Sequence, residues 1–355
     1  MKQAVYFSPF NNKNYVSPLD KITKILQNFQ LSDKITKDEL IAVKVHFGEL
    51  GNTAFISPIY LRPVLSMLKE LKCKPFVTDT NTLYIGMRSN SVDHLHNAML
   101  HGFGYSTLGV PVIIADGLRG ENTLDLPVDF PMVKKARLAA GIMHADGMVV
   151  ISHFKGHEIS GFGGAIKNIS MGCASRGGKM DMHSHARPTV KAEQCTACRR
   201  CISACQVKAI TMAGKAVIGE ECVGCVRCIA VCPEDAIEIN FNESSDNTQM
   251  KMVEYAAALM NEFDDNKLLF INILKDISPA CDCYPGNDIP IADNIGFLAS
   301  QDPVALDKAS FDLVNEKCGY DPFKKVYPDI NTQLQIDHGV KIGLGSSEYQ
   351  LIEIV

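Results

Sequence analysis

Cysteines are the residues in this chain whose number and spacing point most directly to chemistry. The sequence has 13 cysteines in 355 residues, and eight of them fall between positions 195 and 232. They form two copies of the pattern C-x-x-C-x-x-C-x-x-x-C, one from Cys195 to Cys205 and the other from Cys222 to Cys232. Disulfides are rare in a reducing compartment, so this density predicts that the cysteines bind metal.

The doubled pattern predicts two [4Fe-4S] clusters that share their ligands crosswise. In this spacing three cysteines of one copy hold irons of one cubane, while the fourth crosses to the other cluster. Zinc also binds C-x-x-C pairs, but the third cysteine of each copy exceeds what tetrahedral zinc sites need. We therefore assign one cluster to Cys195, Cys198, Cys201 and Cys232, and the other to Cys222, Cys225, Cys228 and Cys205.

The cysteine repeat resembles the bacterial-type two-cluster ferredoxin over about 50 residues, which implies electron transfer. Pro233 follows the last cysteine of the second copy, as in that family, whereas Gln206 stands at the matching place in the first copy. A proline there shapes a turn and bonds no iron. The departure therefore concerns local geometry and not the ligand set.

Changes in composition on both sides of the repeat indicate a small inserted domain. Residues 187–189 precede it and a polar run at 242–248 follows it, and both stretches are typical of linkers. We therefore expect a discontinuous α/β host domain at 1–187 and 242–355. A small α+β ferredoxin-like iron-sulfur domain at 188–241 interrupts it.

The host alternates strand-like and helix-like segments. Short runs rich in β-branched residues predict buried strands at 41–45, 75–78, 112–115, 148–151, 268–273 and 296–299. Helical patterns span 18–29, 58–70, 91–101, 133–144, 250–263 and 303–317. This alternation favours an α/β fold with a largely parallel sheet and helices on both faces.

Titratable residues follow five of the predicted strands. They are His46, Asp79, Asp116, His153 and, shortly after the last strand, Asp302. Ligands in such sheets bind beyond the carboxyl ends of the strands. Each residue could instead cap a turn or a helix. Their joint occurrence nevertheless indicates a site at this edge of the sheet.

Two loops supply the candidate catalytic residues. The loop after the fourth strand contributes His153, Lys155 and His157, and the loop after the first strand contributes His46 and Glu49. Histidine can act as an acid, a base or a metal ligand near neutral pH. Histidines that merely bond the backbone are the alternative interpretation.

Glycines and lysines near the same loops predict a site for a small anionic ligand. Glycines let backbone amides approach an anion, and lysine neutralises its charge. The candidates are Lys167, Gly161, Gly163, Gly164 and Asp302. The segment lacks the third glycine of a dinucleotide fingerprint and the complete P-loop pattern, so we expect neither kind of nucleotide site.

Three further cysteines form a candidate metal site outside the repeat. Cys173 follows the fourth predicted strand, and Cys281 and Cys283 follow the fifth. A turn at Cys281 and Cys283 can aim both thiolates at one soft metal or an additional iron-sulfur centre, possible partners being the histidines at 153 and 157. Three thiols without a metal are the alternative.

The order of these segments resembles the family called domain of unknown function 362 over nearly the whole chain. The resemblance rests on Ser152-His153-x-Lys155-Gly156-His157, Met171-Gly172-Cys173, Cys281-x-Cys283 and Ala299-Ser300-x-Asp302-Pro303-Val304-Ala305. It implies this domain layout around an inserted ferredoxin. It brings no established reaction.

Charge and hydropathy narrow the classes of function. The chain has 35 basic and 40 acidic residues and a net charge of −5, which argues against a nucleic-acid binder. Apolar stretches fall short of the ~20 residues of a membrane helix, and the sequence opens without a signal peptide pattern. We therefore expect a cytoplasmic protein.

The sequence predicts an iron-sulfur redox protein whose insert exchanges electrons with a small-ligand or metal site on the host. A redox partner protein and a small anionic ligand are the expected partners, without nucleic acid or membrane. Two alternatives stay open: a simple electron carrier whose host docks a partner oxidoreductase, and a metal or cofactor maturation factor. The sequence does not identify a substrate. It therefore does not decide whether the chain is an iron-sulfur oxidoreductase.

Overall fold

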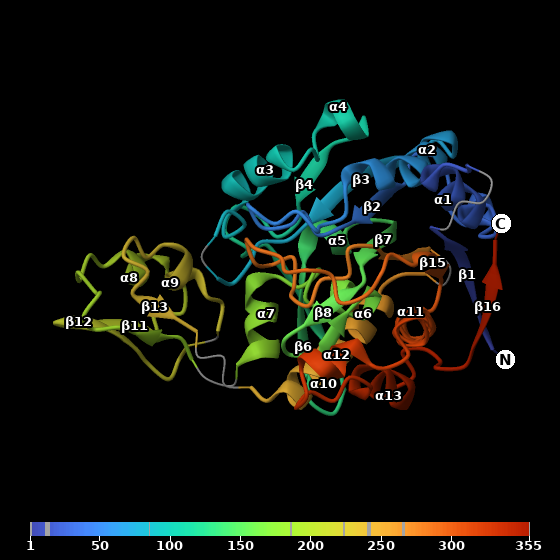
Figure 1. Ribbon diagram of the computed structural model, residues 1–355. Helices are drawn as coiled ribbons and strands as arrows, with labels where there is room; N and C mark the ends of the chain where they lie inside the picture. Colours follow the sequence, from blue (N-terminus) through green and yellow to red (C-terminus); the bar gives the residue numbers. More distant parts are fainter. Residues whose placement is uncertain are drawn as a thin grey trace.

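An eight-stranded sheet forms the centre of the host (Figure 1). The computed structural model describes residues 2–10, 15–84, 86–184, 187–222, 224–239, 243–264 and 267–354. The strand order is β16-β1-β15-β14-β7-β2-β3-β4. The strands are β1 (Gln3–Pro9), β2 (Leu40–Lys44), β3 (Lys74–Asp79), β4 (Val112–Ile114), β7 (Gly147–His153), β14 (Leu268–Leu274), β15 (Gly296–Ser300) and β16 (Tyr349–Glu353).

The sheet is mostly parallel, which confirms the predicted α/β fold class. Strand β15 runs antiparallel to both of its neighbours, β1 and β14, whereas the other neighbouring pairs are parallel. Every residue of β7, β14 and β15 is buried. This burial explains why these strands appear in the sequence as continuous apolar runs, because both of their faces are covered.

Alternate strand residues enter two separate cores, one on each face of the sheet. In β7, Met148 and Val150 belong to one core, while Val149 and Ile151 belong to the other. Helices α6 (Ala165–Ser170), α10 (Ser245–Met260), α11 (Pro303–Cys318) and α13 (Leu334–Lys341) contribute to the first core. Helices α1 (Pro18–Leu26), α2 (Arg62–Glu70), α3 (Ser91–Leu100) and α4 (Tyr105–Leu108) contribute to the second (Figure 1).

One predicted helix of the host is wrong. Residues Lys135–Ala139 of the stretch 133–144 form strand β6, which pairs with β5 (Thr123–Pro127), and the short helix α5 covers Ala140–Met143. Burial in β6 follows the alternation of a strand, since Ala136 and Leu138 are buried while Lys135 is exposed. Pairing with β5 therefore outweighs the helical pattern.

The remaining host elements are short and surround the strand ends. They are the 3-10 helices η1 (Leu31–Asp33) and η2 (Pro58–Leu61), the hairpin of β8 (Lys155–His157) and β9 (Gly161–Gly163), and the helices α7 (Arg176–His183) and α12 (Pro322–Val326). Among the described residues, no helix is long and apolar enough to cross a membrane.

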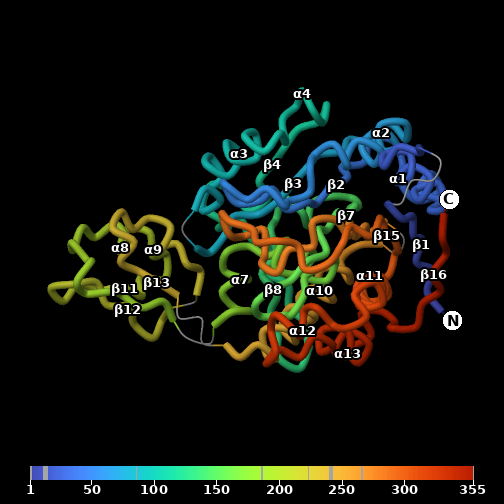
Figure 2. The backbone as a smooth tube through the Cα atoms, in the orientation of Figure 1, coloured from blue at the N-terminus to red at the C-terminus, as the bar shows by residue number. Residues whose placement is uncertain are grey.

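The cysteine repeat folds beside the host with a small core of its own (Figure 2). Strand β10 pairs with β13, and β11 pairs with β12, both antiparallel. Its elements are β10 (Thr189–Val190), α8 (Arg200–Ala204), β11 (Ile210–Ala213), β12 (Lys215–Ile218), α9 (Arg227–Ala230) and β13 (Ile237–Glu238). The domain boundaries at 188 and 241 stay predictions, and residues 240–242 lie outside the described residues. We call this part of the chain the insert.

Candidate functional site

The two cysteine motifs adopt the same backbone conformation. Helices α8 and α9 each begin after a residue in the left-handed region, Arg199 at φ 64° and Val226 at φ 54°. Two further matched pairs have positive φ, Ala197 with Gly224 and Lys208 with Asp235. The sequence repeat is therefore also a structural repeat.

The last cysteine of each motif accepts a backbone hydrogen bond. Ala209 N donates to Cys205 Sγ at 3.2 Å, and Ala236 N donates to Cys232 Sγ at 3.3 Å. Donors of this kind stabilise negative charge on a sulfur ligand. The two fourth cysteines are thus equivalent in their surroundings.

The structure brings the fourth cysteine of the second motif to the first motif. Cys195, Cys198, Cys201 and Cys232 line one small cavity, the set assigned to a single cluster from the sequence. Within the described part of the chain, the eight cysteines of the insert include no three sulfur atoms within 4.8 Å of one another. Two thiolates on one tetrahedral zinc lie ~3.8 Å apart at Zn–S bonds of ~2.3 Å, so this spacing is wide for a single ion.

The second motif is the part of the insert that contacts the host. Val226 is buried in one apolar cluster with Leu83 and Met180 of the host. Arg119 Nη1 also donates to the carbonyl oxygen of Ala230, at 2.8 Å. The first motif points away from this contact and leaves Cys198 exposed.

The host contains a pocket of about 820 Å³ at the carboxyl ends of β2, β3, β7 and β14. This volume suits a small-molecule ligand. The structure places these predicted site residues in its wall: His46, Glu49, His153, Lys155, His157, Gly163, Gly164, Lys167 and Cys283. Leu83 lines the same pocket, so the residue that contacts the insert also borders this space.

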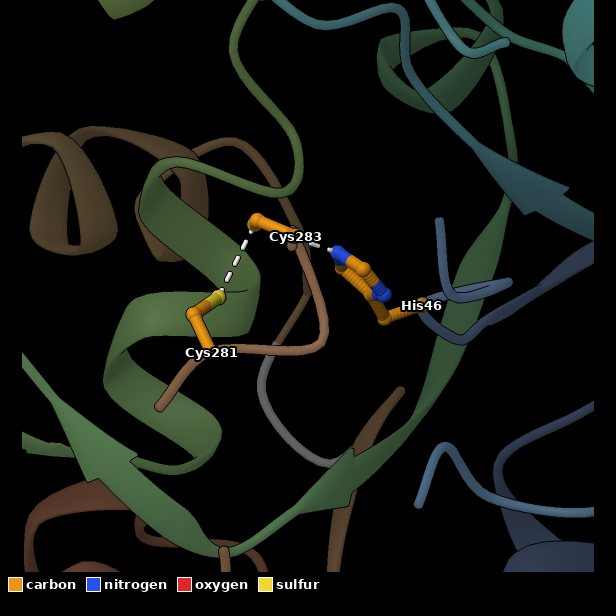
Figure 3. Close-up of side chains that lie close together, drawn as sticks. All are labelled: His46, Cys281 and Cys283. Atoms are coloured by element: carbon orange, nitrogen blue, oxygen red, sulfur yellow. Dashed lines mark hydrogen bonds between the residues drawn. The ribbon is translucent and has the colours of Figure 1, made fainter. Parts of the chain in front are cut away.

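Cys281 and Cys283 meet in a tight turn beside this pocket (Figure 3). Tyr284 N donates to the carbonyl oxygen of Cys281, and the two sulfur atoms are 2.9 Å apart. Lys167 Nζ lies 3.4 Å from Cys281 Sγ. The hydrogen bond from Cys283, aided by the charges of Lys155 and Lys167, holds the pKa of Cys281 well below its usual value.

Asp282, between the two cysteines, fixes the turn to β7. Both of its carboxylate oxygens lie 3.0 Å from His153 Nδ1, and His153 Nε2 lies 2.7 Å from the carbonyl oxygen of Lys275. Both ring nitrogens face oxygen atoms, so these contacts hold the ring between the Asp282 carboxylate and the Lys275 carbonyl. Burial acts to raise the pKa of Asp282, but the charges of His153 and Lys155 outweigh it and lower that pKa.

His46 completes a group of three side chains that could hold a soft metal. One donor atom from each of His46, Cys281 and Cys283 lies within 4.8 Å of the others. The contact between His46 Nε2 and Cys283 Sγ measures 3.4 Å (Figure 3). Thiolate and imidazole are the ligands of zinc, copper and iron sites.

Two nitrogen donors already face the His46 ring. Arg88 Nη1 lies 2.9 Å from Nε2, and Gly48 N donates to Nδ1 at 3.0 Å. Burial, followed by the charge of Arg88, lowers the pKa of His46. Arg88 therefore occupies the direction in which a metal would approach Nε2.

His157 presents a neutral ring to the pocket. Ile159 N and Ser160 N both donate to its Nδ1, each at 3.2 Å, which leaves the proton on Nε2. Burial, with the charge of Lys167, lowers the pKa of His157 to about 3. The Nε2–H group is thus a hydrogen-bond donor toward a ligand.

Four predicted site residues do not line the pocket. Cys281 lies directly behind its wall, and Gly161 packs against Thr332. Cys173 is buried with its sulfur 3.5 Å from the carbonyl oxygen of Asn168, outside the group of Cys281 and Cys283, and burial raises its pKa to about 12.

Asp302, the fourth of these residues, caps α11 at the opposite edge of the sheet. It follows the antiparallel strand β15 and accepts hydrogen bonds from Val304 N and Ala305 N. The strand direction is the physical reason for this position. The roles of Cys173, Gly161 and Asp302 in binding stay predictions.

Sequence reasoning missed Arg88 and Asp282. Arg88 is buried and contacts Glu49 Oε2 at 3.2 Å and the hydroxyl of Tyr84 at 2.6 Å, as well as His46. Glu49 is therefore engaged by Arg88 and by Met87 N. A buried charge pairs with others from distant loops, and no local spacing marks it. The position of Asp282 between two cysteines is the one local signal that could have found it.

Comparisons with known proteins identify one family and two similar solved structures. A family described as domain of unknown function (DUF362) matches residues 41–312. No curated protein matches the chain. Among solved structures, the lactate racemase apoprotein from Thermoanaerobacterium thermosaccharolyticum is similar at 14% identity and a TM-score of 0.45, covering 89% of this chain and 58% of that one.

A Thermotoga maritima protein is similar at 10% identity and a TM-score of 0.43, covering 85% of this chain and 59% of that one. This chain thus spans less than two thirds of the length of either protein. The family match covers most of the sequence. The chain belongs to the family of domain of unknown function 362.

Proposed function

We propose that this chain is an iron-sulfur redox protein, in which two [4Fe-4S] clusters in the insert exchange electrons with a ligand in the host pocket. The observation that carries the proposal is the cavity shared by Cys195, Cys198, Cys201 and Cys232. A crossed ligand set is what two adjacent cubanes require. The clusters, when bound, supply one-electron transfer.

The surroundings of the cysteines suit a cluster rather than a single ion. Among the described residues, no three of these sulfur atoms lie within 4.8 Å of one another, which suits a cluster better than one zinc ion. Cys205 and Cys232 each accept a backbone N–H, and Arg199, Arg200 and Arg227 lie between the ligands. Positive charge and N–H donors stabilise the more negative, reduced clusters.

The contact between insert and host supports electron transfer between the second cysteine motif and the host pocket. A cluster held by the second motif would lie next to Val226, which touches Leu83 at the border of the pocket. A cluster held by the first motif would lie beside the exposed Cys198. A redox partner protein would therefore exchange electrons at the first motif, and the pocket would do so through the second.

The pocket favours a redox enzyme over a plain carrier. A carrier needs clusters near an exposed face, whereas this host holds about 820 Å³ of space lined by converging polar groups. Lys155 and Lys167 line this space and would supply positive charge for a small anionic ligand. We also propose that the protein is cytoplasmic, because cysteines that bind metal rather than form disulfides are typical of a reducing compartment.

A second candidate function is metal handling by the host. The convergence of His46, Cys281 and Cys283 is the observation for it, and the positive groups of Arg88 at His46 and Lys167 at Cys281 count against it. On this interpretation the three residues would bind a soft metal ion transiently, and the clusters would reduce that ion.

Electron paramagnetic resonance of the full chain, purified without oxygen and reduced with dithionite, tests the proposed function. We expect about two unpaired spins per chain, because each [4Fe-4S] cluster accepts one electron. The two signals should broaden each other, since the clusters are neighbours. A protein that contains zinc and shows no such signal would overturn the proposal.

A further inference from the structure

We propose that Cys281 and Cys283 form a redox dithiol that closes to a disulfide by giving two electrons to the clusters and reopens when it regains them. This inference rests on the proposed function. On this inference, Cys281 and Cys283 are a two-electron centre in the host. They would transfer electrons between the one-electron clusters and a ligand in the pocket.

The geometry of the turn carries the proposal. The sulfur atoms lie 2.9 Å apart, so a bond between them needs no rearrangement of the fold. Tyr284 N closes the turn by donating to the Cys281 carbonyl, and Glu49 N donates to the Asp282 carbonyl at 2.9 Å. The Asp282 carboxylate contacts His153 of β7. In an extended segment alternate side chains point to opposite sides, and this turn removes that obstacle.

Lys167 supports the thiolate that such chemistry needs. Its ammonium group is 3.4 Å from Cys281 Sγ, and Cys281 is 1% exposed. The attacking form of a cysteine is the thiolate, and a neighbouring lysine favours it. Cys283 lies on the pocket side, where a ligand can reach its sulfur.

The same distances disfavour a metal ion. Two thiolates bound to one zinc stand ~3.8 Å apart, which exceeds the 2.9 Å observed here. Arg88 lies against the Nε2 atom of His46 that a metal would need, and Lys167 lies against Cys281. Two fixed positive charges at the donor atoms repel a divalent cation.

The redox step balances with the clusters as the electron acceptors. The Cys281 thiolate and the Cys283 thiol form one S–S bond and release two electrons and one proton. Each oxidised cluster takes one electron, and the proton leaves from Cys283 into the pocket that this residue lines. The reverse step takes one electron from each reduced cluster and one proton from the pocket.

Counting electrons in the intact protein tests the inference. The full chain is purified without oxygen, reduced with dithionite, freed of reductant and titrated with a mild redox dye. Wild type should release about four electrons per chain, two from the clusters and two from the dithiol. Cys281→Ser and Cys283→Ser should each release about two, while the matched control Cys318→Ser should release about four.

Mass spectrometry and metal analysis of the same samples separate the outcomes. The oxidised peptide with both cysteines should lack two hydrogens and resist alkylation. A wild-type count of about two electrons, with both thiols still alkylated, would overturn the dithiol. So would one additional metal ion per chain that is lost in Cys281→Ser. Absence of clusters with a dithiol that still cycles would contradict both the proposed function and the clusters as electron acceptors, and would leave only the redox dithiol itself.

Discussion

The insert and the host pocket hold their cysteines in opposite ways. In the insert all eight cysteines lie within 38 residues, from Cys195 to Cys232, and two copies of one backbone conformation present them. In the host, Cys281 and Cys283 share one turn after β14, but the groups around them come from the segments after β2, β3 and β7. Ligand spacing defines the first site, and sheet topology defines the second.

The two regions also differ in their charges. The arginines of the insert lie near the surface, and Cys198 is exposed. The host pairs its buried charges, as in Asp282 with His153 and Arg88 with Glu49. Buried pairs of this kind fix geometry, and breaking one partner is costly. On the proposed function, the insert would exchange electrons with an outside partner, and the host would hold a defined site.

The largest expected effect is the loss of one whole cluster from the insert. Cys232→Ala should remove the cluster held by Cys195, Cys198 and Cys201, because the fourth ligand crosses over. Iron should fall from about eight to about four per chain, as measured on protein purified without oxygen. Cys205→Ala should remove the other cluster, while Cys318→Ala should keep all iron.

Spectra of the two variants decide whether the ligands cross. If Cys232→Ala left the cluster of the first motif intact and destroyed that of the second, each motif would bind its own cluster and the assignment would be wrong.

A second prediction concerns the independence of the insert. Its ligands are local and it has its own apolar core, so residues 188–241 expressed alone should assemble both clusters. Iron and sulfide analysis of this fragment checks the prediction. Should the fragment stay free of iron while the full chain binds it, the contact of Val226 with Leu83 and Met180 would be needed for assembly.

A smaller effect is expected at the host cysteines when Lys167 loses its charge. Lys167→Met removes the ammonium group beside Cys281 Sγ. The pH of half-maximal alkylation of Cys281 by iodoacetamide should rise by about one to two units, the equivalent of one charge-assisted hydrogen bond. Lys167→Arg keeps the charge and should keep the wild-type midpoint. An unchanged midpoint in Lys167→Met would show that the lysine does not act on this thiol.

The smallest predicted effect is a change in acid stability at His157. Its pKa in the folded protein is about 3, well below the usual value of 6.5, because the ring is buried. Between pH 6.5 and about pH 3, His157 binds a proton in the unfolded chain but not in the folded chain. The free energy of unfolding therefore decreases as the pH falls through this range.

His157→Gln should flatten this dependence by up to ~1.4 kcal/mol per pH unit. The unfolding temperature of the full chain, measured without oxygen between pH 7 and pH 4, provides the check. His144→Gln, at an exposed position, is the matched control. Parallel curves for wild type and His157→Gln would contradict the assignment of a buried neutral ring.

The sequence predicted those parts of the molecule that depend on local pattern. All six predicted strands exist, as β2, β3, β4, β7, β14 and β15. Continuous apolar runs mark strands that are buried on both faces, such as β7 and β14, whereas β4 is partly exposed and the prediction that it is buried is wrong. Strands β1 and β16, with partly exposed residues, lack that signal.

The host site could be predicted in part. His46, His153 and Lys155 follow parallel strands, so the common edge places them in one pocket. The antiparallel direction of β15 is not visible in its residues, and it moves Asp302 to the other edge. Arg88 and Asp282 escaped prediction because their partners lie far away in the sequence.

Mössbauer spectroscopy of the full chain, enriched in ⁵⁷Fe and purified without oxygen, tests the central claim most directly. The account predicts that one diamagnetic [4Fe-4S] signal accounts for essentially all iron, with about eight iron atoms per chain. Iron in isolated single-ion sites, or zinc in place of iron at the cysteines of the insert, would contradict it.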